Sequence, residues 1–84
     1  MKKVTIYTGS PCPFCEQAKA LLKSKNISFE EIDVSKNQDK AKEMLQKTNG
    51  ARTIPQIFIG DHHIGGNDQL QEANRSGELE KLLS

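Results

Sequence analysis

The first half of the chain begins with a hydrophobic pattern that changes from strand to helix periodicity. Residues 4–8 are rich in β-branched and aromatic side chains and are followed by Gly-Ser-Pro over 9–11, which predicts a strand and then a loop. Over 13–25 the apolar side chains fall on one helical face and the charged ones on the other, which predicts an amphipathic helix with a proline in its first turn. A second strand is predicted over 27–34, where apolar and polar residues alternate with one slip of phase.

A second helix is expected after this strand. Ser35 and Gln38 have the spacing of a capping box, an apolar stripe follows over 41–48, and Asn49-Gly50 is typical of a helix end. The order so far is strand, helix, strand, helix. Strands joined through a helix are normally parallel, with a right-handed crossover, so we expect the first two strands to run in the same direction.

The pattern then indicates a hairpin and a last helix. Two short runs, 57–59 and 62–64, flank Gly60-Asp61, a pair that suits a type II′ turn because glycine comes first. Such a hairpin makes the sheet mixed. Asn67-Asp68 begins the last helix, and Gly77 breaks it before the final leucines pack down. The predicted order is βαβαββα.

Size and charge limit what the chain can do. With 84 residues it is expected to form one domain over 1–84, and 12 Lys+Arg against 11 Asp+Glu leave a net charge of +1. Nucleic acid is therefore not an expected partner, and a mean hydropathy of −0.65 argues against a membrane span. The apolar stretch after the basic start is broken by threonines, which predicts a strand and not a signal peptide. We expect a cytosolic protein, in which a disulfide is more often catalytic than structural.

The candidate chemistry lies in Cys12-Pro13-Phe14-Cys15, at the predicted start of the first helix. There, unpaired backbone N–H groups and the helix dipole favour an anion, so the thiolate of Cys12 is expected to be stabilised. Cys15 is on the inner helical face and should be more buried. The pair therefore suits thiol–disulfide exchange, in which the exposed thiolate attacks and the inner thiol resolves the mixed disulfide.

Two other interpretations of the cysteines are a structural disulfide and a zinc site. A purely structural disulfide would close a loop of about four residues and contribute roughly 2 kcal/mol, less than the roughly 3 kcal/mol of a fifteen-residue loop. A zinc site with His62 and His63 has the right number of ligands. Neighbouring strand residues point to opposite faces, however, and zinc fingers separate their histidines by three to five residues. We therefore expect both histidines to be ordinary solvated strand residues, with no metal bound.

Three segments together resemble the small bacterial glutaredoxins, and the resemblance spans the whole chain. The segments are Cys12-Pro13-Phe14-Cys15, Thr53-Ile54-Pro55 and Gly65-Gly66-Asn67-Asp68. The resemblance implies an α/β protein with the thioredoxin fold in its minimal form. This fold has a four-stranded mixed sheet of strand order 2-1-3-4 flanked by helices, which agrees with the order expected from the pattern.

The resemblance also implies a glutathione site. Pro55 would have a cis peptide bond and face the cysteines, and the backbone of Ile54 would pair with the cysteine moiety of glutathione as a strand does. Asp68 would meet the ammonium group of the γ-glutamyl end, and Arg52 would lie near the glycine carboxylate. The implied glutathione-binding residues are Phe14, Arg52, Thr53, Ile54, Pro55, Gly66, Asn67 and Asp68. From the residues alone, Pro55 could equally start a strand, and Asn67-Asp68 could equally cap a helix.

The implied function is that of a dithiol glutaredoxin, an enzyme that reduces protein disulfides and glutathione mixed disulfides. Cys12 would attack and Cys15 would resolve, with glutathione as co-substrate and no bound cofactor. The implied partners are glutathione and disulfide-bonded or glutathionylated proteins, and we expect a monomer. A redoxin reduced by thioredoxin reductase is one rival, against which Arg52 and residues 65–68 argue. A non-enzymatic iron–sulfur scaffold is another, against which Pro13 argues.

The chain departs from the family pattern at several positions. Phe14 stands where many members have tyrosine, and Gly9 stands where many have a lysine three residues before the first cysteine. Asn67 occupies a position often held by cysteine or serine. The missing lysine removes one cation expected beside the thiolate and the glycine carboxylate.

Overall fold

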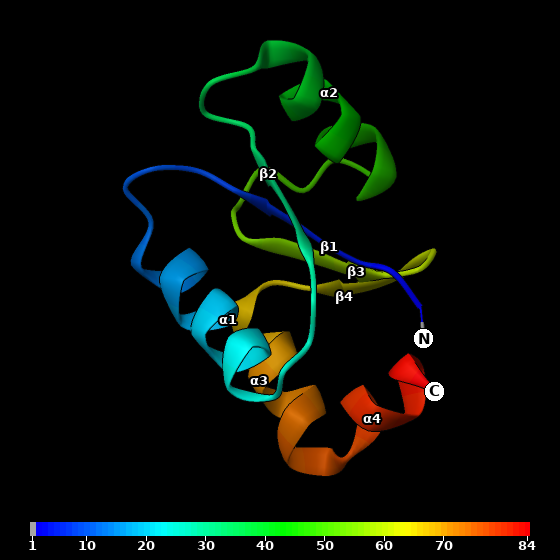
Figure 1. Ribbon diagram of the computed structural model, residues 1–84. Helices are drawn as coiled ribbons and strands as arrows, with labels where there is room; N and C mark the ends of the chain where they lie inside the picture. The colour runs from blue at the N-terminus through cyan, green and yellow to red at the C-terminus, as the bar shows by residue number, and fades with distance from the viewer. Residues whose placement is uncertain (1) are drawn as a thin grey trace.

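Eight helices and strands follow one another in the computed structural model, which describes residues 2–84 (Figure 1). They are β1 Val4–Thr8, α1 Pro13–Ser24, β2 Glu30–Asp33, α2 Gln38–Lys47, β3 Gln56–Ile59, β4 His62–Gly65, α3 Asn67–Ser76 and α4 Glu78–Leu83. The predicted order is confirmed for seven of them, and the residues after Gly77 form α4 as an additional short helix. Over residues 2–84, none of the helices has the length and apolar character needed to cross a membrane.

The strands form one mixed sheet in the order β2-β1-β3-β4. β1 runs parallel to β2 and antiparallel to β3, and β3 pairs antiparallel with β4. The α/β class and the strand order implied by the resemblance are therefore confirmed. The Gly60-Asp61 turn of the hairpin is confirmed too, since Ile59 pairs with His62 and Gly60 has φ +58°.

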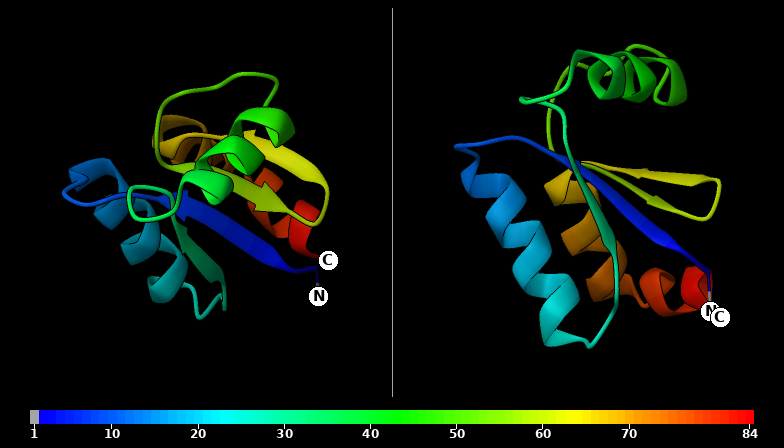
Figure 2. Two further views of the ribbon diagram at one scale, coloured as in Figure 1. Left: turned by 90° about the horizontal axis from the view of Figure 1, so that it is seen from above. Right: turned by 45° about the horizontal axis from the view of Figure 1, so that its top comes forward.

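Helices cover both faces of the sheet, because alternate strand residues are apolar on each side. α1 and α3 lie on one face, with α4 at their far end, and α2 lies on the other (Figure 2). The larger core, on the α1–α3 face, contains Val4, Ile6, Ala18, Leu22, Ile27, Ile57, Ile59, Leu70, Ala73, Leu79 and Leu83. The smaller core, beneath α2, contains Tyr7, Met44 and Phe58.

Two predicted boundaries were wrong for local reasons. Asn37 caps α2 in place of Ser35, because its Oδ1 accepts the N–H groups of Asp39 and Lys40. Ser35 is instead hydrogen-bonded to Asp33. Oδ1 of Asp33 accepts both the backbone N–H and the hydroxyl of Ser35.

The second strand is also shorter than predicted and begins at Glu30 instead of residue 27. Asn26 has a left-handed φ of +57°, and the N–H of Ile27 bonds the carbonyl of Leu22 at the end of α1. Such contacts are typical of a helix C-terminus, so residue 27 takes part in the turn that ends α1 and does not pair in the sheet.

Candidate functional site

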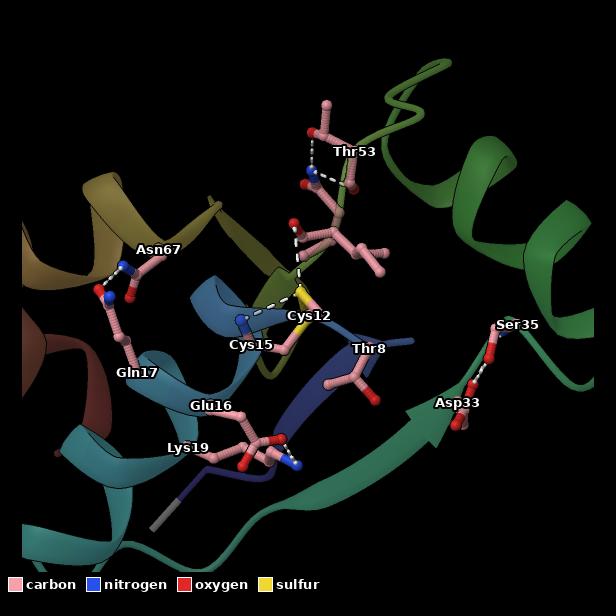
Figure 3. Close-up of a disulfide and its surroundings, with 12 residues drawn as sticks. Thr8, Cys12, Cys15, Glu16, Gln17, Lys19, Asp33, Ser35, Thr53 and Asn67 are labelled. Carbon is pink, nitrogen blue, oxygen red and sulfur yellow. Dashed lines mark hydrogen bonds and ion pairs between the residues drawn. A yellow bond between two sulfur atoms is a disulfide. The ribbon is translucent and has the colours of Figure 1, made fainter. Parts of the chain in front are cut away.

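Cys12 and Cys15 lie at the N-terminus of α1 and are joined by a disulfide (Figure 3). Cys12 is the N-cap residue, with extended backbone at φ −154°, and Pro13 takes the first helical position. The N–H of Cys15 points at Sγ of Cys12 across 3.1 Å. A free backbone donor at a helix start stabilises negative charge, so the structure places Cys12 where the sequence analysis expected a thiolate.

The two cysteines differ in access. Cys15 is 0% exposed and lies on the inner face of α1 with Ala18 and Leu22, whereas Cys12 is half-buried. A large substrate can therefore reach the sulfur of Cys12 more easily than that of Cys15.

The segment before β3 approaches the same sulfur. Pro55 follows a cis peptide bond, as the resemblance implied, and the carbonyl oxygen of Ile54 lies 4.0 Å from Sγ of Cys12. The Ser10–Pro11 bond is also cis, which the sequence did not predict. The backbone of Ile54 thus lies beside the reactive pair.

A pocket of about 290 Å³ opens next to this backbone. Its lining residues are Phe14, Thr53, Ile54, Pro55, Gly66, Asn67, Asp68 and Gln69. The fold therefore brings together seven of the eight residues implied in glutathione binding, from α1, the segment before β3 and the start of α3. Arg52 is the exception, because it lines a neighbouring pocket between α2 and Ile54.

The start of α3 is held by side-chain amides. Asn67 is buried, and its Nδ2 donates to Oε1 of Gln17 on α1 while its Oδ1 accepts from Gln71 (Figure 3). Gln69 Oε1 accepts the N–H of Gly66. The side chain of Asn67 therefore holds the start of α3 against α1 through the hydrogen bond to Gln17 and accepts a second hydrogen bond from within α3. Sequence reasoning missed Gln17 and Gln69. The capping-box spacing of Gly66 and Gln69 could have revealed Gln69, whereas Gln17 has no partner recognisable from spacing.

Gly9 lies in close contact with the side chain of Ile54. A Cβ on this residue would lie 2.6 Å from Cδ1 of Ile54 and 3.6 Å from Cβ of Ser35. Real Cβ atoms do not come so close to another carbon atom. The absence of a side chain at Gly9 thus makes room for the longer branch of Ile54 beside Cys12.

An ionic cluster on α1 and β2 joins one lysine to two glutamates. Nζ of Lys19 lies 2.9 Å from Glu16 and 3.0 Å from Glu31, and Thr8 donates its hydroxyl to Glu31 across 2.8 Å. The hydroxyl of Thr8 and then the ammonium group of Lys19 hold the pKa of Glu31 below its ordinary value. The carboxylates of Glu16 and then Glu31 raise the pKa of Lys19. The ammonium group of Lys19 is therefore engaged in ion pairs that join α1 to β2.

Comparison with known proteins identifies the family. The family model described as Glutaredoxin matches residues 4–64. The chain is 48% identical over 83 residues to glutaredoxin 3 of Escherichia coli strain K12, covering 99% of each. The chain belongs to the glutaredoxin family. It is therefore a glutathione-dependent thiol–disulfide oxidoreductase with the redox-active pair Cys12 and Cys15.

Solved glutaredoxins have the same fold. The solution structure of a glutaredoxin from Brucella melitensis is 44% identical, with a TM-score of 0.84, and the match covers 99% of this chain and 89% of that one. A buckwheat glutaredoxin–glutathione complex is 29% identical, with a TM-score of 0.86, and the match covers 98% of this chain and 76% of that one. The thioredoxin fold implied by the sequence is confirmed for this glutaredoxin.

The two histidines of this glutaredoxin have different surroundings. His62 is exposed, as expected, but the expectation was wrong for His63, which stacks on Phe58 and lies 2.6 Å from Oε1 of Gln56. The predicted two-residue turn at Gly60-Asp61 already places His63 opposite Phe58, so the sequence contained a signal for this contact. Within residues 2–84, no three His, Cys, Asp or Glu side chains form a group that could hold a metal ion.

Proposed function

We propose that Cys12 is the attacking and Cys15 the resolving thiol of this glutaredoxin. The observation that carries this assignment is the pairing of an accessible Cys12 with a fully buried Cys15 whose N–H points at the Cys12 sulfur. The N–H stabilises the thiolate of Cys12, both as nucleophile and as leaving group. The short Cα–Cα distance of 5.2 Å lets Cys15 reach a mixed disulfide on Cys12.

The proposed reaction with a glutathionylated protein has two exchanges. The Cys12 thiolate attacks the glutathione sulfur, the protein thiolate leaves and takes a proton, and a Cys12–glutathione disulfide forms. A second glutathione thiolate then attacks the glutathione sulfur of that disulfide. Oxidised glutathione leaves and the Cys12 thiolate is restored. One free glutathione is consumed, and the disulfide has passed from the glutathionylated protein to oxidised glutathione.

Reduction of a protein disulfide uses both cysteines. The Cys12 thiolate displaces one protein sulfur, and the Cys15 thiolate then attacks Sγ of Cys12 and displaces the other. The product enzyme contains the Cys12–Cys15 disulfide, the state seen in the structure. Two glutathione molecules return it to the dithiol.

We place glutathione in the pocket beside Ile54. Its cysteine backbone pairs with that of Ile54, Phe14 forms an aromatic wall with Thr53 and Pro55 nearby, and its γ-glutamyl carboxylate meets the N–H groups at the start of α3. Asp68 pairs with its ammonium group, and Arg52 reaches its glycine carboxylate from the neighbouring pocket. The lining of the pocket supports this placement, and the related buckwheat protein forms a complex with glutathione.

The proposal needs no bound metal or prosthetic group, because the sulfur atoms of the enzyme and of glutathione carry both electrons. Such a pair suits the cytosol, where glutathione keeps thiols reduced. We propose that a single chain is sufficient, since the described pocket and both cysteines come from one copy.

The two roles are tested by Cys12→Ser and Cys15→Ser in an assay with a glutathionylated peptide, glutathione, glutathione reductase and NADPH. Cys15→Ser should retain most deglutathionylation, and Cys12→Ser should abolish it. With a protein disulfide as substrate, Cys15→Ser should also lose most activity. Equal loss of deglutathionylation in both variants would contradict the assignment.

A further inference from the structure

The segment that carries Ile54 is held from inside by the side chain of Gln56. Gln56 is 3% exposed, and its Nε2 lies 3.0 Å from the carbonyl oxygen of Thr53 and 3.0 Å from the Thr53 hydroxyl. A carbonyl oxygen only accepts hydrogen bonds, so the amide nitrogen of Gln56 has to face Thr53. The orientation of the amide is thereby fixed.

His63 completes this arrangement from β4. The fixed amide turns Oε1 of Gln56 toward Nε2 of His63, at 2.6 Å, and that nitrogen must be the donor. The imidazole stacks on Phe58 with ring centroids 4.8 Å apart and an angle of 20° between the planes. The ring is therefore held by packing on one side and by a hydrogen bond at its edge.

The hydrogen bonds of Gln56 also set the orientation of the Thr53–Ile54 peptide, which lies beside Cys12. The Thr53–Ile54 peptide is trans, so its C=O and N–H point in opposite directions. Because the carbonyl of Thr53 points at the buried amide of Gln56, the N–H of Ile54 points away from it. In residues 2–84, that N–H has no backbone partner among the loop and turn hydrogen bonds.

We infer that Gln56, oriented by His63, is a positioning residue for glutathione. The two side chains fix the Thr53–Ile54 peptide so that Ile54 presents its N–H and carbonyl to the extended backbone of the ligand. This inference rests on the proposed glutathione pocket and adds residues that do not line it. A residue that only filled the core would affect folding and leave the affinity for glutathione unchanged.

His63→Phe is the informative variant, because it keeps a ring that can stack on Phe58 and removes the donor to Gln56. His62→Phe is its matched control on the adjacent exposed residue. Gln56→Met is a second variant, which keeps length and burial and removes the amide. Far-UV circular dichroism establishes that each variant is folded.

The first measurement is steady-state reduction of a glutathionylated peptide. His63→Phe removes the hydrogen bond to Gln56 and should raise KM about fivefold, with kcat within twofold. Gln56→Met removes the hydrogen bonds to Thr53 as well and should raise KM at least as much. His62→Phe should match the wild type. An unchanged KM in folded His63→Phe, or an equal rise in His62→Phe, overturns the inference. Activity of the wild type separately tests the proposed function.

The second measurement does not depend on turnover. S-methylglutathione, which has no exchangeable disulfide, is titrated into the oxidised protein while the Ile54 amide is followed by ¹⁵N NMR. The amide signal should shift in the wild type and in His62→Phe, with about fivefold weaker binding in His63→Phe. Absence of a shift at Ile54 in the wild type, or equal affinity in all folded variants, overturns the inference.

Discussion

The N–H of Cys15 and the sulfur of Cys12 face each other across 3.1 Å, at the first turn of α1. The donor belongs to the buried cysteine and the acceptor to the accessible one. One residue thus supplies both the stabilising donor and the second thiol of the pair.

In the reduced protein, iodoacetamide at neutral pH should modify Cys12 at least ten times faster than Cys15. The reason is that thiolate character and access both favour Cys12. Peptide mass spectrometry after timed quenching measures the two rates. In denaturant the rates should converge, and comparable rates in the folded protein would contradict the assignment.

Gly9→Ala should destabilise the protein by about 0.5–1.5 kcal/mol, because its Cβ would force Cδ1 of Ile54, the end of a half-buried side chain, out of its rotamer. Ile54→Val removes that atom, so the same Gly9→Ala change should cost less in the Ile54→Val background. Urea unfolding of the four proteins gives the coupling energy. If the two effects on the free energy of unfolding are additive, contact with Ile54 is not the reason why Gly9→Ala destabilises the protein.

Tyr7 is the only tyrosine, which lets its ionisation be followed by near-ultraviolet absorbance. Burial first, and then the hydrogen bond to Glu43 at 2.5 Å, raise its pKa above the ordinary value of about 10. The unfolded chain therefore loses this proton at lower pH than the folded one. Stability should fall as pH rises above about 10. Tyr7→Phe should remove this part of the alkaline loss, and ionisation of folded Tyr7 near pH 10 would contradict it.

Glu31→Gln should lower stability at neutral pH by about 0.5 kcal/mol, a small value because this carboxylate is partly exposed. Its pKa is lowered in the folded state, first by Thr8 and then by Lys19. The stabilisation is therefore present above the ordinary pKa of about 4.3 and is lost as pH falls through the lower folded value. Urea midpoints at neutral and strongly acidic pH should differ between the proteins only at neutral pH. An equal difference at both would contradict the ionic origin.

Periodicity and turn residues predicted the element order, because each change of period coincides with a real change of structure. The mixed sheet followed from the helical connection of β1 to β2 and the hairpin at Gly60-Asp61. Capping was harder to predict, since Ser35 and Asn37 both have suitable side chains. The choice depends on Asp33, which binds Ser35 and leaves Asn37 to cap α2.

The cysteines and most of the pocket could also be anticipated, since they lie in segments with recognisable spacing. His63 was missed, although the two-residue turn at Gly60-Asp61 already places Phe58 opposite His63, with both side chains on the α2 face of the sheet. The pairing with β4 shifts only beyond this pair, where Ile57 lies opposite Gly65. A sequence pattern gives the alternation of side chains but not that shift.

Because of the order of the strands in the sheet, enzymatic activity requires that the whole sheet has formed. Cys12 follows β1, while the Thr53–Pro55 segment leads into β3, and these two strands become neighbours only when Val4 pairs with Ile59. Neither the first forty nor the last forty residues contain both a reactive thiol and the backbone that faces it. During refolding, enzymatic activity should therefore return only with the long-range β1–β3 contact, later than the local helical signal of α1.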